Sequence, residues 1–251
     1  MPNHIPENYK PAPDLLKDRV ILVTGASDGI GRAVAESFAA HGSTVILLAR
    51  TIKKLEAVYD TIMAAGGPEP AIYPLDLEGA NEADYHDLAE NIRKEYGRLD
   101  GLLHNAGILG ILSPIEHYDV GVWQKTMHIN VNAAFALTKA CLPVMYESRD
   151  ASIVFTSSGV GRKGRAYWGA YAVSKFATEG MMQILADEVE SRDMLRVNSI
   201  NPGATRTKMR LAAYPAEDRD KLPQPKDIVA PYLYLFGPDS RGVSGETFDC
   251  Q

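Results

Sequence analysis

The stretch RVILVTGASDGIG, residues 19–31, joins a short β-branched run to a cluster of glycines. A buried strand that ends at Thr24 and is followed by three glycines predicts a tight turn into a helix. The amides of such a turn, together with the helix N-terminus, are suited to face a pyrophosphate. The spacing is T-G-x-x-x-G-x-G, which differs from the general dinucleotide fingerprint, and glycines after a strand also occur in plain turns. Because a strand precedes the glycines and a helix follows them, we expect dinucleotide binding. The glycines are Gly25, Gly29 and Gly31.

Short apolar runs alternate with helical patterns along the rest of the chain. The runs lack strict polar alternation, which suits strands buried on both faces. Their succession predicts an α/β fold: a single-domain, doubly wound parallel sheet of the Rossmann type with helices on both faces. No repeat or linker divides the sequence, so we expect one domain over residues 18–251, with residues 1–17 as an extension on the surface. The expected strands are residues 19–24, 43–49, 71–76, 99–104, 151–157 and 195–201.

Composition narrows the class of partner. The 251 residues carry a formal net charge of −6, and their basic residues are scattered, which argues against nucleic acid or an anionic membrane as the main partner. The prolines and charges of residues 1–19 are unlike a signal peptide or a membrane anchor. Only two cysteines, Cys141 and Cys250, are present, and no cluster has metal-ligand spacing. We therefore expect a cytoplasmic protein without a bound metal.

A second motif, YAVSK at residues 171–175, places a phenol and an amine one helical turn apart. Side chains at this spacing lie one above the other, and the positive charge of Lys175 would favour the anion of Tyr171. A phenol pKa moved toward neutrality would suit proton exchange. Tyr and Lys at this spacing are common by chance, so the pair alone does not establish catalysis.

With further motifs in order, the chain resembles the short-chain dehydrogenase/reductase family over about residues 19–248. The resemblance implies an NAD(P)-dependent oxidoreductase that transfers hydride between the nicotinamide and a carbonyl or alcohol. The alternative from another class is a nucleotide-binding sensor or scaffold without turnover, which would need the glycine loop but not Ser158. The motifs are TGASDGIG (24–31), HNAG (104–107), HINVNAAF (128–135), TSSGVG (156–161), YAVSK (171–175) and NPGATRT (201–207).

The resemblance assigns four catalytic positions. Tyr171 would exchange the substrate proton, and Lys175 would lower the phenol pKa and bind the nicotinamide ribose. Ser158, thirteen residues before Tyr171, would hydrogen-bond the substrate oxygen. Asn130, five residues before Phe135, would hold a water that leads to Lys175.

Three nearby polar residues are expected to lie outside the chemistry. Ser157 is in the wrong register and is predicted to be structural. Asn132 is not the position that matches the family asparagine. His104 follows a strand and is more typical of a packed, hydrogen-bonded residue than of a catalytic base.

The resemblance also implies a cofactor site that spans several loops. Asn105, Ala106 and Gly107 would wall the adenine ribose, and Asp76, with the Leu77 amide, would reach the adenine. Pro202 and Gly203 would turn the backbone beneath the nicotinamide, whose carboxamide Thr207 would hold. The full expected set is Gly25, Ser27, Asp28, Gly29, Ile30, Gly31, Arg50, Thr51, Asp76, Leu77, Asn105, Ala106, Gly107, Tyr171, Lys175, Pro202, Gly203, Thr205 and Thr207.

The residue after the second strand predicts the nucleotide. An NAD site of this type usually has Asp or Glu there, about twenty residues past the glycine loop. This chain has Arg50, which would grip a 2′-phosphate, and Thr51 would add a hydroxyl. Asp28 would oppose a phosphate if its side chain reached the ribose. We expect NADP(H) to be preferred over NAD(H), unless Arg50 is merely a solvated loop residue.

Substrate contacts and assembly are the last expectations. Tyr167 and Trp168 are expected to line the carbonyl pocket with Ser158, Tyr171 and a substrate lid at 208–224, unless the two aromatics are plain core. The substrate is expected to be a small molecule whose identity the lid does not reveal.

The family resemblance implies that the helix after Tyr171 and the one after Asn130 pack against a two-fold mate, in a homodimer or homotetramer. The alternative for the apolar stripe of the first helix is packing within the subunit. The absence of a DGG-like ending, where the chain has ETFDCQ, puts the assembly in doubt. The stripe is Met181, Met182, Leu185 and Val189.

Overall fold

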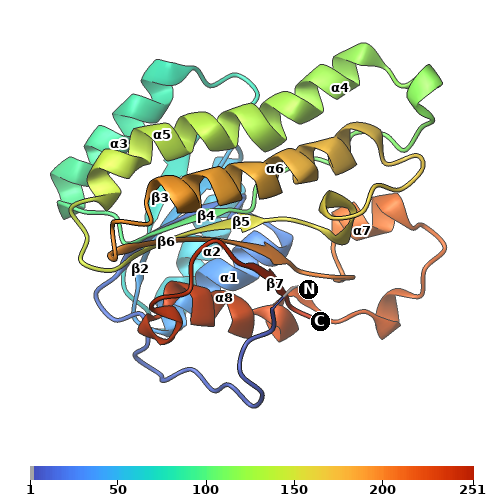
Figure 1. Cartoon of the computed structure of the whole chain (residues 1–251). Helices are drawn as coiled ribbons and strands as arrows, with labels where there is room; N and C mark the ends of the chain where they lie inside the picture. Colours follow the sequence, from blue (N-terminus) through green and yellow to red (C-terminus); the bar gives the residue numbers. More distant parts are fainter. Residues whose placement is uncertain (1–2) are drawn as a thin grey trace.

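Seven parallel strands form one sheet in this computed structural model, which describes residues 3–251 (Figure 1). The order β3-β2-β1-β4-β5-β6-β7 means that the chain builds outward from β1 and then crosses over to start again beside it at β4. Such a reversal leaves a crevice at the carboxyl ends of the central strands. The strands are β1 (Val20–Thr24), β2 (Thr44–Ala49), β3 (Ala71–Pro74), β4 (Gly101–His104), β5 (Ala151–Thr156), β6 (Leu195–Asn201) and β7 (Thr247–Asp249).

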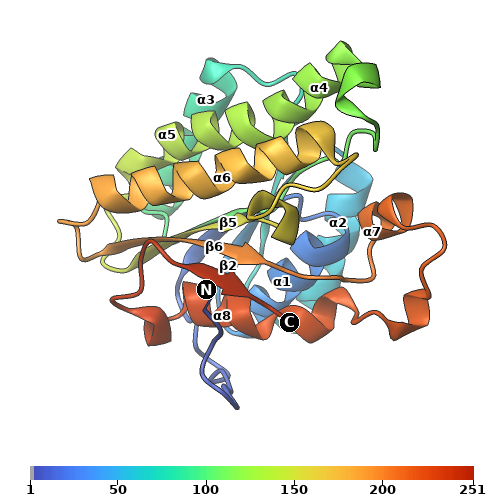
Figure 2. The ribbon, with the colours of Figure 1, turned by 45° about the vertical axis from the view of Figure 1, so that its right-hand side comes forward.

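Helices cover both faces of the sheet, as the sequence predicts (Figure 1). One face packs against α3, α5 and α6, and the other against α1, α2 and α8. Figure 2 shows α7 apart from these layers, at the end of the sheet where the strands finish. The helices are α1 (Gly29–Ala40), α2 (Ile52–Ala64), α3 (Glu82–Tyr96), α4 (Val120–Met127), α5 (Ala133–Met145), α6 (Gly169–Glu188), α7 (Lys208–Ala213) and α8 (Ala230–Phe236).

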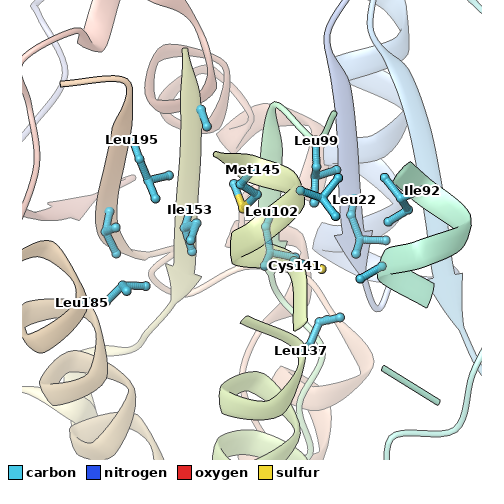
Figure 3. Close-up of a cluster of buried hydrophobic side chains, with 14 of the residues drawn as sticks. Leu22, Ile92, Leu99, Leu102, Leu137, Cys141, Met145, Ile153, Leu185 and Leu195 are labelled. Atoms are coloured by element: carbon cyan, nitrogen blue, oxygen red, sulfur yellow. The ribbon is translucent and has the colours of Figure 1, made fainter. Parts of the chain in front are cut away.

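The apolar strands separate two cores because side chains alternate along a strand. On β1, Leu22 joins the core beneath α3, α5 and α6, whereas Ile21 and Val23 join the core on the other face. Figure 3 shows Leu22 and Leu102 of the first core beside Cys141. Burial on both faces explains why these runs lack polar alternation.

The expected strands differ from the observed ones mainly at their ends. The expected strand 71–76 stops at Pro74, although the amide of Leu75 still donates to the Ala49 carbonyl at 3.1 Å. The expected strand 99–104 begins at Gly101. The strand β7 was not predicted, because three residues give too short an apolar pattern to recognise.

The apolar stripe of α6 is buried inside the subunit, so of its two expected roles packing within the subunit is the one that the structure shows. Met182, Leu185 and Val189 belong to the core under α6, and Met181 packs against it. The helical period identified an apolar face correctly, but it does not say which surface covers that face.

The N-terminal extension is held to the rest of the subunit at two points. Asn3 forms a parallel bridge with Phe248, and its amide donates to the Thr247 carbonyl at 2.7 Å. Leu16 is fully buried in the core beneath α1. The arm therefore covers the edge of the sheet at β7.

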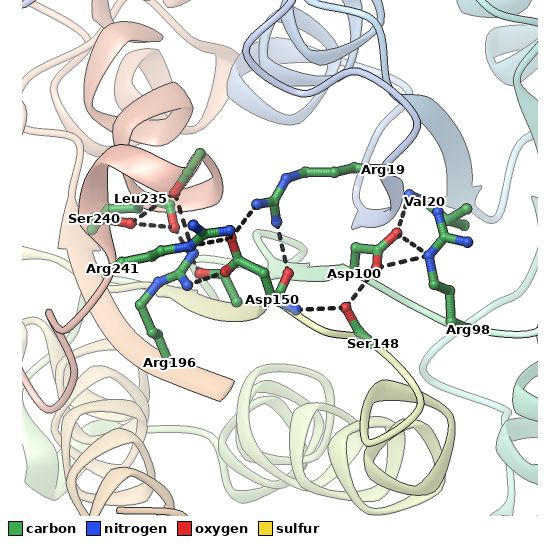
Figure 4. A network of polar contacts seen from close by, with 12 residues as sticks. Arg19, Val20, Arg98, Asp100, Ser148, Asp150, Arg196, Leu235, Ser240 and Arg241 are labelled. Carbon is green, nitrogen blue, oxygen red and sulfur yellow. Dashed lines mark hydrogen bonds and ion pairs between the residues drawn. The ribbon is translucent and has the colours of Figure 1, made fainter. Parts of the chain in front are cut away.

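A polar network ties the strands together at their amino ends, opposite the crevice (Figure 4). The Asp150 carboxylate accepts hydrogen bonds from Arg19 at 2.5 Å, from Arg196 and from Arg241 at 3.0 Å. Asp150 and Arg196 are both buried, so each charge offsets the desolvation of the other. The network therefore links the amino ends of the strands, away from the crevice.

Candidate active site

The glycine loop between β1 and α1 has a backbone that side chains would disrupt. Gly25 and Gly29 have positive φ angles of 68° and 55°, which favour glycine. A Cβ on Gly31 would lie 2.3 Å from the carbonyl oxygen of Gly25. The Asp28 carboxylate caps α1 by accepting from the Gly29 amide at 2.9 Å. The loop therefore keeps its backbone open to the crevice.

A cavity of about 360 Å³ runs from this loop across the carboxyl ends of the strands. Most of the predicted cofactor residues line it, together with residues outside the predicted cofactor set. The predicted residues in its wall are Gly25, Ser27, Asp28, Gly29, Ile30, Arg50, Asp76, Leu77, Asn105, Ala106, Gly107, Tyr171, Lys175, Pro202 and Thr207. The additional ones are Leu48, Ala49, Leu75, Ile108, Ile129, Thr156, Ser157, Lys208 and Met209.

Several predicted site residues do not line the cavity, and their places explain why. Gly31 is buried behind the loop, and Thr51 precedes α2 on the exposed side. Gly203 and Thr205 face the side chain of Gln251. Asn130, Ser158, Tyr167 and Trp168 are likewise not part of the cavity wall.

The Thr24 hydroxyl fixes the segment after β4. It accepts hydrogen bonds from the amides of Asn105 and Ala106, both at 3.0 Å. The Asn105 side chain donates to the Thr24 carbonyl at 3.2 Å. These contacts across the central strands hold HNAG against the glycine loop.

Asn130 lies in a π-helical turn, His128–Asn132, between α4 and α5. Its side-chain amide donates to the Ile108 carbonyl at 2.9 Å and to the Ser174 hydroxyl at 3.0 Å, and its oxygen accepts from the Ile108 amide at 2.8 Å. Asn130 therefore joins the loop after β4 to α6. Single π turns inside helices often occur at functional sites. Asn132 is exposed, as expected for a residue outside the site.

Tyr171 and Lys175 lie together at the base of the cavity. Lys175 is 6 % exposed, and its ammonium group donates to the Thr156 carbonyl at 2.6 Å. The same nitrogen lies 5.6 Å from the centre of the Tyr171 ring. The helical spacing thus brings the two groups together at the end of β5.

The expected lowering of the phenol pKa is wrong for the protein without cofactor. Burial raises the pKa of Tyr171 to about 12, and a hydrogen bond with Ser158 opposes that rise. Burial also lowers the pKa of Lys175 to about 8, while the charge of Glu179 acts in the opposite direction. Desolvation is the largest cause of both shifts because both groups are almost fully buried. At neutral pH the phenol is neutral and the lysine charged.

The two serines after β5 occupy different places. Ser158 caps a short 3₁₀ turn, Gly159–Gly161, and it is near enough to Tyr171 to lower the phenol pKa. Ser157, predicted to be structural, lines the cavity and is 2 % exposed. Within the described chain its hydroxyl has no hydrogen-bond partner. Sequence register separated the serines but did not show that both border the site.

His104 is a packed residue, as predicted. Its ring stacks on Phe155 with centroids 4.7 Å apart, and its Nε2 lies 2.8 Å from the Thr138 hydroxyl. Burial and the charge of Lys175 lower the pKa of His104 to about 3. The imidazole is therefore neutral at physiological pH, beside the lysine.

The end of the cavity beside β2 carries an excess of positive charge. Arg50 is exposed in the cavity wall. The Asp28 carboxylate accepts from Lys208 at 2.5 Å and lies 3.7 Å from Lys54. The hydrogen bond from Lys208 lowers the pKa of Asp28. With Asp76 also in the cavity wall, three basic groups face two carboxylates at this end, which leaves a net positive charge.

Aromatic side chains border Tyr171 on its open side. The Trp168 ring lies 5.7 Å from that of Tyr171 and 5.8 Å from that of Tyr214, which follows α7. Arg210 covers the Tyr214 ring at 3.9 Å. Tyr167 is 61 % exposed, which excludes the core alternative for this residue. Residues 208–224 therefore meet the segment before α6 beside the phenol.

The sequence profile described as short chain dehydrogenase matches residues 19–218. The chain belongs to the short-chain dehydrogenase family. It is an NAD(P)-dependent oxidoreductase of the dehydrogenase/reductase type. A curated relative is the uncharacterized oxidoreductase YciK of Escherichia coli K12, which is 55 % identical over 244 residues, covering 97 % of this chain and 96 % of YciK.

Solved structures of family members superpose closely on this one. A short chain dehydrogenase from Pseudomonas syringae is 56 % identical with a TM-score of 0.96, over 97 % of this chain and 99 % of that one. A short chain dehydrogenase from Escherichia coli CFT073, complexed with NADPH, is 56 % identical with a TM-score of 0.93, over 96 % of this chain and all of that one. The fold is therefore that of the short-chain dehydrogenases.

Residues 3–251 lack two features, a metal-binding cluster and a membrane-spanning helix. No group of three or more His, Cys, Asp or Glu side chains in this range is arranged to hold a metal ion. Nor is any helix in the same range long and apolar enough to span a bilayer.

Proposed function

We propose that this short-chain dehydrogenase uses NADP(H), in preference to NAD(H), to interconvert a small-molecule carbonyl compound and its alcohol, with Tyr171 as general acid and base. The observation that carries the proposal is the meeting of Tyr171 and Lys175 in the wall of the cavity that begins at the glycine loop. The bound nicotinamide would supply or accept the hydride. The residues of this chain would bind the nucleotide and move the proton.

Proton transfer is the task of the groups around Tyr171. The neutral phenol is the form that donates to a carbonyl oxygen, and its raised pKa keeps it neutral. Ser158 would hydrogen-bond the same oxygen as negative charge develops there. Lys175 would place a positive charge under the phenol and bind the ribose. Asn130 would hold the loop after β4 against α6.

The preference for NADP(H) rests on charge at the β2 end of the cavity. Arg50 can donate two parallel hydrogen bonds to a 2′-phosphate. Asp28, the acid that would oppose a phosphate, is paired with Lys208 at 2.5 Å. The relative complexed with NADPH supports the same choice.

The substrate side would be formed by Trp168, Tyr167 and residues 208–224, which act as a lid on the single catalytic domain of residues 18–251. The contact between Trp168 and Tyr214 supports this role. A cytoplasmic homodimer or homotetramer completes the proposal. An aromatic wall beside the phenol suits an apolar or planar carbonyl compound.

The experiment that tests the function is a panel of ketones, aldehydes, quinones and acyl thioesters, each mixed with NADPH or NADH while nicotinamide absorbance is followed. We expect turnover of at least one carbonyl class, faster with NADPH. Tight nucleotide binding without turnover of any class would instead support the sensor or scaffold function.

A further inference from the structure

The last residues of the chain contact the turn that follows β6. The Gln251 side chain donates to the Pro202 carbonyl at 2.6 Å and to the Thr205 hydroxyl at 3.3 Å. Between them, Gly203 has a φ of 73°, and a Cβ there would lie 2.8 Å from the Gln251 amide nitrogen. Gln251 therefore closes the back of this turn, whose Pro202 lines the cavity on the other side.

Asp249 joins the same strand end to the loop that carries Ser158. Its Oδ1 accepts from the Asn201 side chain at 2.9 Å and from Arg162 at 2.7 Å. Arg162 comes directly after the 3₁₀ turn that Ser158 caps, and it also donates to the Phe248 carbonyl at 3.1 Å. The side chains of Asp249 and Arg162 are 18 % and 22 % exposed, so the pair is screened from most of the solvent.

The Arg162 guanidinium continues the connection to the catalytic helix. Its Nε donates to the Glu179 carboxylate at 3.3 Å, one turn after Lys175 on α6. The other oxygen of Glu179 accepts from the Ser199 hydroxyl at 2.6 Å. One guanidinium thus joins the Ser158 loop, the helix of Tyr171 and Lys175, and the end of the chain.

The segment 247–251 is itself held from two sides. Its strand pairs with β6, and the Cys250 amide donates to the Asn201 carbonyl at 3.0 Å. On the outer edge, the Asp249 amide donates to the Asn3 carbonyl at 3.0 Å. Side chains alternate along the segment. Phe248 therefore enters the core beneath α1, α2 and α8, while Asp249 and Gln251 share the opposite face.

We propose that Asp249 and Gln251 are positioning residues of the active site: Asp249 fixes the Ser158 loop through Arg162, and Gln251 fixes the turn 202–205 against the nicotinamide end of the cavity. Neither residue lines the cavity. They therefore act by fixing the positions of residues at the site. In this way the segment 247–251 holds two walls of the site in place. This inference rests on the proposed function.

Two isosteric variants test the two halves. Gln251→Glu removes the donor to Pro202, and Asp249→Asn removes the charge that Arg162 meets. We expect Gln251→Glu to raise the dissociation constant and KM of NADPH about two- to tenfold, the range that one neutral hydrogen bond corresponds to. We expect Asp249→Asn to lower kcat by a similar factor, with the affinity for NADPH nearly unchanged. Both should keep a Tm close to that of the unmodified protein.

The matched control is Asn3→Ala, which removes a side-chain hydrogen bond of 2.8 Å to Glu246 beside the same strand but outside the cavity wall. Its kinetics should equal those of the unmodified protein. The inference is overturned if Gln251→Glu and Asp249→Asn leave KM and kcat unchanged, or if their losses only follow the fraction of folded protein. If an isosteric variant unfolds, Gln251→Asn or Asp249→Glu, which keeps the amide or the charge but changes its reach, takes its place with the same expected direction of effect.

Failure of the proposed function gives a different result. The dissociation constant of NADPH, measured by fluorescence quenching, needs no turnover. A protein that binds NADPH but reduces nothing in the panel contradicts the function, whereas the Gln251→Glu effect on binding still decides the inference. An active protein with unchanged Gln251→Glu and Asp249→Asn variants contradicts the inference alone.

Discussion

The ammonium nitrogen of Lys175 lies 5.6 Å from the centre of the Tyr171 ring, and it donates to the carbonyl at the end of β5. The lysine thus stays beneath the ring rather than bonding to the phenol oxygen. The phenol oxygen is therefore shared with Ser158, the residue proposed to meet the same substrate oxygen, and not with the lysine.

Removing that oxygen is the first prediction. Tyr171→Phe should lower kcat about 10²- to 10⁴-fold, the usual contribution of general acid–base catalysis, because the phenol is the group proposed to give the proton. Nucleotide affinity should stay nearly the same, since the phenol acts on the substrate. Steady-state kinetics and NADPH binding measure the two effects. Turnover near that of the unmodified protein would show that Tyr171 is not the proton donor.

The second prediction concerns pH. The pKa of Lys175 is about 8, so its positive charge is fully present below that pH and is lost as the pH rises through it. Hence kcat/KM for NADPH, which reports the free enzyme, should fall above about pH 8. Glu179 raises the pKa of Lys175, so Glu179→Gln should move this fall to lower pH.

The control for the pH shift is Glu188→Gln, on the exposed end of the same helix. Its profile should match that of the unmodified protein. A Glu179→Gln profile that does not move would contradict the electrostatic link between Glu179 and Lys175.

Features that depend on residues close together in the sequence could be predicted, whereas contacts between residues far apart in the sequence could not. Local signals predicted the parallel sheet, the glycine loop and the spacing of Tyr171 and Lys175. The contact of Asp28 with Lys208 joins residues 180 positions apart, and that of Gln251 with Pro202 joins residues 49 apart. Neither has a periodic or motif signal, because tertiary packing alone brings them together. The pKa of Tyr171 was mispredicted for a related reason: the charge of Lys175 is visible in sequence, but burial is not.

The third prediction is about access to the site. Trp168→Ala should change the ranking of substrates in the panel, because the ring contacts both Tyr171 and Tyr214. Aromatic pairs contribute about 0.5–1.5 kcal/mol beyond buried area, so KM should rise about two- to tenfold for the carbonyls that stack on the ring. NADPH affinity should be little changed. An unaltered ranking would mean that Trp168 only packs.

The fourth prediction concerns the assembly. Since the stripe Met181, Met182, Leu185 and Val189 packs within the subunit, another surface must form the contact. The outer side of α5 and α6 exposes Phe135, Val173, Phe176 and Ile184, each more than two-fifths accessible. An apolar group of this kind on the surface favours a second copy. Light scattering should give at least twice 27.4 kDa at micromolar concentration. Phe176→Glu should shift the mass toward that of the monomer, whereas Met63→Glu, which places a charge on exposed α2, should not.

The last prediction is the preference for NADP(H) and its dependence on Arg50. A hydrogen bond between charged groups contributes roughly 1.5–3 kcal/mol, so the guanidinium should favour NADP(H) about ten- to a hundredfold. Arg50→Asp should abolish or invert the preference, because a carboxylate repels the 2′-phosphate and accepts from a 2′-hydroxyl. The Tyr171 chemistry should persist with NADH.

Titration of both nucleotides at two salt concentrations measures this preference. Affinity for NADP(H) should fall as salt rises, since the contact with exposed Arg50 is screened. The matched control is Lys53→Asp, which makes the same charge change on exposed α2 outside the cavity wall and should retain most of the preference. Equal affinities in the unmodified protein would contradict the role of Arg50. An equal loss in both variants would assign the preference to the general field of α2 rather than to a direct contact.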